Sequence, residues 1–133
     1  MGTAIYIVTQ KEIEDLDTFV NGKAIGKASD KAMFKICREI GQPSLYDFVS
    51  QDPEELREMI EESGADVPEN LPDEMWFQPD EGKKFVTELL KYFHANSKAM
   101  KNVEGLIEDL DEYERIFDEL QVRGVKWHFA VDC

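Results

Sequence analysis

The fold is set by Val125-Lys-Trp-His-Phe-Ala-Val-Asp132, in which large apolar residues alternate with polar or small ones. Alternation with a period of two predicts a β-strand that turns one face to the core and the other to solvent. The predicted inner face holds Val125, Trp127, Phe129 and Val131, and the outer face holds Lys126, His128, Ala130 and Asp132.

The opposite end of the chain predicts a second strand. Residues Thr3 to Thr9 are rich in β-branched and aromatic side chains, the composition typical of strands. Helical spacing and end signals between the two strands predict four longer helices. These run from a cap at Ser29 or Asp30 to Ile40, from Asp52 to Ser63, from Pro79 through Phe93, and from Val103 to Gln121. We therefore expect an α+β fold: a small sheet that includes the N- and C-terminal strands, with about four helices packed mainly on one face.

Two shorter features precede the first of these helices. Residues Lys11 to Asp17 predict a short helical turn. Asn21-Gly22 is a strong turn signal, so Phe19-Val20 and Ala24-Ile25 on either side predict a small hairpin. Asn21 with Lys23 could serve as an anion-binding turn, although a tight turn with a solvated lysine is the favoured interpretation.

Length and composition predict one globular domain over residues 1–133. The chain is 42% apolar and 33% charged, and its apolar runs are far shorter than the ~20 residues that span a membrane. No signal-peptide pattern is present, so we expect a cytoplasmic protein.

The two cysteines, Cys37 and Cys133, are expected to be unpaired: Cys37 on the apolar stripe of a helix, and Cys133 at the chain end.

The net charge of −14 is unevenly distributed. Residues 52–81 hold twelve acids and one base, residues 104–119 eight acids and one base, and residues 82–103 five lysines and one acid. An acidic balance disfavours nucleic acid as a partner, because phosphates would be repelled, and favours a basic protein. The sequence does not indicate an oligomeric state.

Two large aromatics, Trp76 and Phe77, lie within the acidic stretch 52–81 in a proline-rich loop. Such rings either anchor a partner or pin the loop to the core, and pinning is the favoured interpretation. The candidate binding residues are Trp76, Phe77, Asp73, Glu74 and Asn21.

Catalytic signals are weak. The chain has no phosphate-binding loop, nucleophile elbow, zinc motif or calcium loop, so no cofactor or metal is expected. His94 lies on the polar side of its helix and is interpreted as a solvated histidine. The weak catalytic candidates are His128 and Lys23, which would need a partner from another part of the fold, such as Tyr6.

Three stretches together resemble a family of small, acidic, uncharacterised bacterial proteins. They are Asp17-Thr-Phe-Val-Asn-Gly-Lys-Ala24, Trp76-Phe-Gln-Pro-Asp-Glu-Gly82 and Gly124-Val-Lys-Trp-His-Phe-Ala-Val-Asp132. More distantly, the order of parts resembles the YfbM-like bacterial domains. The resemblance implies no activity and supplies no functional residue.

These observations leave three hypotheses. The first is a non-enzymatic protein-binding or regulatory domain with an acidic surface, for example an immunity-type protein that neutralises a toxin. The second is a small enzyme with a polar site near His128 and Lys23. The third, a DNA mimic, would need carboxylates spaced like phosphates and ranks last.

Overall fold

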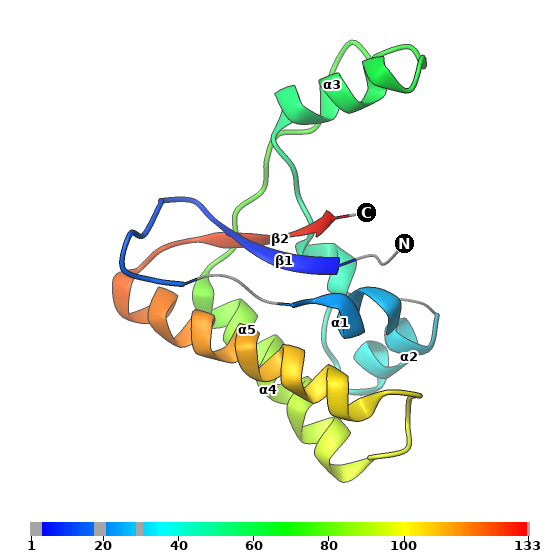
Figure 1. Ribbon diagram of the computed structural model, residues 1–133, viewed down its shortest axis with the longest axis vertical. Coiled ribbons are helices and arrows are strands. Elements are labelled where there is room, and N and C mark those ends of the chain that lie inside the picture. Colours follow the sequence, from blue (N-terminus) through cyan, green and yellow to red (C-terminus); the bar gives the residue numbers. More distant parts are fainter. Residues whose placement is uncertain (1–3, 18–20, 29–30, 133) are drawn as a thin grey trace.

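The computed structural model describes residues 4–17, 21–28 and 31–132. Within these ranges the two terminal strands form one antiparallel sheet, with Ile7 opposite Phe129 and Thr9 opposite Trp127. The expected α+β class and the shared sheet are confirmed (Figure 1). The elements are β1 (Ala4–Thr9), α1 (Lys23–Ala28), α2 (Lys31–Glu39), the 3₁₀ helix η1 (Leu45–Phe48), α3 (Pro53–Glu62), α4 (Pro79–Ala95), α5 (Val103–Arg123) and β2 (Trp127–Asp132).

The inner face of the sheet packs against α4 and α5 and forms the core. Trp127 and Phe129 are completely buried, and the Trp127 ring lies 4.5 Å from that of Phe117, between ring centroids. The Tyr113 hydroxyl of α5 donates a 2.7 Å hydrogen bond to the carbonyl oxygen of Ile5 in β1. Burial raises the pKa of the Tyr113 phenol, so the hydroxyl remains a donor. The predicted inner face of the last strand is thus confirmed at Trp127 and Phe129.

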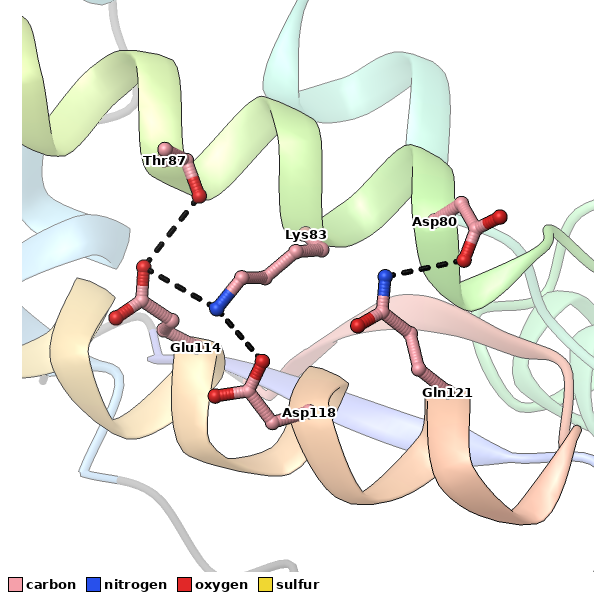
Figure 2. Close-up of polar contacts among 6 residues, drawn as sticks. All are labelled: Asp80, Lys83, Thr87, Glu114, Asp118 and Gln121. Carbon is pink, nitrogen blue, oxygen red and sulfur yellow. Dashed lines mark hydrogen bonds and ion pairs between the residues drawn. The ribbon is translucent and has the colours of Figure 1, made fainter.

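Helices α4 and α5 form an antiparallel pair joined at the surface by polar contacts (Figure 2). Lys83 of α4 lies 2.6 Å from a carboxylate oxygen of Asp118 and 3.6 Å from one of Glu114. The hydrogen bond to Asp118 raises the pKa of the Lys83 ammonium. Because these groups are partly exposed, their contribution to stability is small, and they mainly fix how the two helices align.

The hairpin prediction around Asn21-Gly22 is wrong. Residues Lys23–Ala28 form helix α1 instead, and Phe19 and Val20 lie outside the described residues. Gly22 has a φ of 63°, and its carbonyl oxygen accepts hydrogen bonds from the amides of Ile5 and Gly26, both at 3.0 Å. The left-handed glycine therefore starts a helix beside β1, and does not reverse a strand.

The other sequence predictions have mixed outcomes. Lys11 to Asp17 contains a turn but no helix. Asp52 caps α3 as expected, because its side chain accepts a 2.9 Å hydrogen bond from the amide of Glu54. Thr3, Ser29, Asp30 and Cys133 lie outside the described residues.

Helix α3 is the exception to the one-sided packing. It lies on the opposite side of the sheet from α4 and α5 and joins the body through two lengths of chain (Figure 1). None of the helices in the described ranges combines the length and apolar character needed to cross a membrane.

Candidate functional site

The site is organised by a segment that leaves the sheet and returns to it, residues 50–76, here named the α3 arm. At its start the Ser50 amide donates to the carbonyl oxygen of Phe129 at 3.0 Å. Just after its end Phe77 exchanges two backbone hydrogen bonds with Trp127, at 2.8 and 3.1 Å. The arm has two limbs, the chain before α3 and the chain after it. They are also joined directly, because the Met75 amide donates to the Ser50 hydroxyl at 2.7 Å. Both limbs of the arm are therefore fixed at the edge of β2.

Helix α3 itself is weakly packed. None of its side chains is buried, although Leu56, Met59 and Ile60 follow the spacing of an apolar helix face. Met59 is 57% exposed, and Met75 on the returning limb is 58% exposed. Exposed methionines of this kind are common at binding surfaces, since the side chain is flexible and apolar.

A groove of about 400 Å³ separates the arm from the outer face of the sheet. Its floor is the sheet face that α4 and α5 leave uncovered, including Tyr6, Val8 and Ala130. Met59 contributes an apolar side chain from the arm. The remaining lining residues come from the limbs of the arm, from α3 and from β2: Val49, Ser50, Gln51, Asp52, Glu55, Glu74, His128 and Val131.

The groove is acidic as well as apolar. The α3 arm contains ten acids and one base, Arg57, for a net charge of −9. The groove is lined by Asp52, Glu55 and Glu74 and by no lysine or arginine. Asp52 caps α3 and Glu74 contacts His128, whereas Glu55 lies exposed at the start of α3. The negative potential therefore attracts cationic side chains to an apolar floor.

His128 occupies the arm side of β2 and is 2% exposed. Its Nε2 atom lies 2.6 Å from a carboxylate oxygen of Glu74, and its Nδ1 atom lies 2.8 Å from the carbonyl oxygen of Phe129. The ring of Trp76 covers it, with centroids 4.6 Å apart. The sequence assigned His128 to the solvent-facing side of the strand, and the arm buries that side.

The structure therefore brings together three of the residues singled out in the sequence: Glu74, Trp76 and His128. Phe77 packs beside them against the core, with its ring centroid 5.1 Å from that of Phe48. Asp73 is exposed on the returning limb of the arm.

Asn21 and Lys23 lie elsewhere, at the start of α1. The Asn21 side-chain oxygen accepts a 3.3 Å hydrogen bond from the Lys23 amide, as in a tight turn. Lys23 is exposed and does not line the groove that His128 lines. The two weak catalytic candidates therefore do not share this groove.

Sequence reasoning missed Glu55 and Met59 as site residues. The available signal was the narrow apolar stripe of α3, Leu56, Met59 and Ile60, in a helix whose other positions are mostly acids. Tyr6 was considered only as a partner for His128, and it is 40% exposed on the groove floor.

No group of three or more histidine, cysteine or acidic residues in the described part of the chain is arranged to hold a metal ion. Comparisons with family models, with curated proteins and with solved structures found no match. The family resemblance noted in the sequence therefore stays a prediction.

Proposed function

We propose that this chain is a non-enzymatic protein-binding domain whose groove between the α3 arm and the sheet takes a basic segment of another protein. The observation that carries the proposal is the combination of an uncovered apolar sheet face with a carboxylate-rich wall. A segment in which lysine or arginine alternates with apolar residues matches both surfaces. A toxin neutralised by an immunity-type protein would be one partner of this kind.

Charge and apolar contact have different parts in this proposal. The arm's net charge of −9 speeds the encounter with a cationic partner and makes the rate depend on salt. Exposed ion pairs add only about 0–1 kcal/mol each, so affinity must come mainly from apolar contacts. Tyr6 and Met59, both exposed in the free protein, are the side chains that a partner would cover.

The volume of the groove supports a linear segment as the occupant. At about 400 Å³ it admits a few side chains but not a whole helix. The enzyme hypothesis has less support, because both ring nitrogens of His128 already contact protein oxygens. A general base needs a nitrogen that can reach the substrate.

The proposal is tested with a fluorescent synthetic peptide of alternating lysine and leucine, and with a glutamate–leucine peptide as the matched control. We expect the lysine peptide to bind, binding to weaken as salt rises, and the glutamate peptide not to bind. Glu55→Lys should weaken binding by about tenfold or more, because it places like charges together in the groove. Met59→Ala should cost about 1 kcal/mol or more of binding free energy.

Glu108→Lys is the control for charge, since Glu108 is exposed on α5 and does not line the groove. It changes the net charge by the same amount as Glu55→Lys. Equal losses in the two variants would show that only overall charge matters and would contradict a specific groove. Failure of the lysine peptide to bind at low salt would contradict the proposal as a whole.

A further inference from the structure

A second cavity lies away from the α3 arm, between α1, α2, the start of α5 and the chain that joins α4 to α5. Its volume is about 570 Å³, and we name it the alanine recess. The described residues that line it include two lysines, Lys27 and Lys101, and no acid. The other lining residues are Asn102 and six apolar ones: Ala24, Ala28, Ala32, Ala99, Met100 and Leu106.

The alanine recess is open because small side chains form most of its wall. Ala24 and Ala28 lie one turn apart on α1, and Ala32 lies in the first turn of α2. Leu106 of α5 is 1% exposed and belongs to the core. The recess therefore reaches from the surface to the core, and an apolar chain placed in it would be removed from water.

The alanine recess lies in a basic part of an acidic chain. Residues 22–38 contain five bases and one acid, and residues 96–102 contain two lysines and no acid. Within the described ranges no ion pair joins Lys27 or Lys101 to an acid. The Asn102 side-chain oxygen accepts a 3.1 Å hydrogen bond from the Gly105 amide, so its NH₂ group is the part that can donate to a ligand. These groups together favour an anion.

We propose that the alanine recess binds a small carboxylate that carries an apolar chain. Lys27 and Lys101 hold the carboxylate, the NH₂ group of Asn102 is a further donor, and the apolar wall takes the chain. This site is separate from the groove beside the α3 arm, because the two have no lining residue in common. It does not depend on the function proposed for that groove.

The charge of the whole chain restricts the occupant to a small anion. A long acidic segment or an anionic membrane would face the acidic parts of the chain as well as the recess, and the net charge of −14 would repel it. A single carboxylate in the recess lies next to the two lysines, and salt at 0.1 M screens acids more than about 10 Å away. The volume of about 570 Å³ is within the range of small-molecule sites.

The proposal is tested with octanoate, titrated into the nitrogen-15-labelled protein at neutral pH while the backbone amide shifts are followed. We expect saturable changes that are largest at Ala28, Ala32, Ala99 and Leu106. Acetate has the carboxylate without the chain and should bind at least about tenfold more weakly. Octylammonium has the chain with the opposite charge and should bind in the recess at least about threefold more weakly. Changes confined to amides outside the recess, or equal binding of octylammonium there, would overturn the proposal.

Two double variants test the lysines. Lys27→Gln with Lys101→Gln removes both ammonium groups and should weaken octanoate binding by about threefold or more. The matched control is Lys35→Gln with Lys98→Gln, which changes the net charge equally at exposed lysines that do not line the recess. The control should change affinity by less than about 1.5-fold. Equal losses in the two double variants would overturn the assignment of Lys27 and Lys101.

Ala32→Glu tests the position of the site. Ala32 is exposed, so a glutamate there should leave the fold intact and should weaken octanoate binding by about fivefold or more, because it places like charges together. Ala95→Glu, at an exposed position outside the recess, is the control and should bind octanoate as the parent does. Circular dichroism checks the folding of each variant. Parent-like binding by Ala32→Glu would overturn the site, and tighter binding of the glutamate–leucine peptide than of octanoate in the recess would overturn the assignment to a small ligand.

Discussion

Phe77 and Trp127 exchange two backbone hydrogen bonds, with nitrogen–oxygen distances of 2.8 and 3.1 Å. Trp127 also donates from its indole Nε1 to the carbonyl oxygen of Gln78 at 2.9 Å. The returning limb of the α3 arm is therefore held at the edge of β2, directly beside the core. This connection explains why an arm whose helix buries no side chain can present a defined groove.

Replacement of Trp127 by alanine tests the place of this side chain in the core. The residue is completely buried, so Trp127→Ala should lower the free energy of unfolding by about 3–5 kcal/mol, including the cavity left behind. Urea denaturation followed by circular dichroism measures the change. A melting temperature equal to that of the parent protein would contradict the assignment of Trp127 to the core.

Trp76→Ala distinguishes two roles for the Trp76 ring: holding the arm against the sheet, or anchoring a partner. Trp76 is partly buried and lies on His128 without lining the groove, so we expect a loss of about 0.5–1.5 kcal/mol in stability. Peptide affinity should fall less than in Met59→Ala. The opposite result, unchanged stability with a large loss of affinity, would identify Trp76 as the anchor.

Gly82 in α4 tests how tightly the helix pair packs on the last strand. A Cβ atom at this position would lie 2.5 Å from Cε1 of Phe117 and 2.6 Å from Cζ2 of Trp127. Both rings are fully buried and have little room to move, so Gly82→Ala should cost about 1–3 kcal/mol of stability. Lys84→Ala on the exposed side of the same helix is the control and should change stability by less than about 0.5 kcal/mol.

Cys37 should not react with thiol reagents in the folded protein. It is 1% exposed, and burial raises the pKa of its thiol to about 11. Near pH 8 only about one molecule in a thousand would carry the reactive thiolate. In a Cys133→Ser background we expect a thiol reagent to label nothing at native pH and one thiol after denaturation. Rapid labelling of the native protein would contradict the burial of Cys37.

The same shift predicts a pH effect on stability. Burial raises the pKa of the Cys37 thiol in the folded state, so burying the neutral thiol contributes fully to the free energy of unfolding below the unfolded-state pKa of about 9. This contribution should be lost as the pH rises from about 9 toward 11. Cys37→Ala should remove that part of the alkaline destabilisation, as measured by urea unfolding near pH 8 and pH 10.

The terminal strands could be predicted from the sequence because their signals are local. The alternation through Trp127 and Phe129 has the period of a strand, and both residues are buried as expected. The sequence signal for the end of α5 is equally local, because Gly124 takes the left-handed conformation that stops a helix, with a φ of 65°.

The candidate site was harder to predict, because it depends on contacts between distant parts of the chain. Glu74 and His128 are 54 positions apart and meet only because the arm folds back on β2. The outer face of β2 has the pattern of a solvent-exposed surface, and nothing local indicates that Trp76 covers it. Asn21-Gly22 wrongly predicted a hairpin, because a left-handed glycine can begin a helix as well as close a hairpin.

The central claim is that a basic segment binds between the α3 arm and the sheet, and NMR chemical-shift mapping tests it most directly. The lysine–leucine peptide is titrated into the nitrogen-15-labelled protein at low salt, and the backbone amide shifts are followed. We predict that the largest changes fall on the groove at Tyr6, Val8, Glu55, Met59 and Ala130. Changes confined to the exposed acidic face of α5, around Glu108 and Asp111, would contradict the claim, because binding would then follow charge alone.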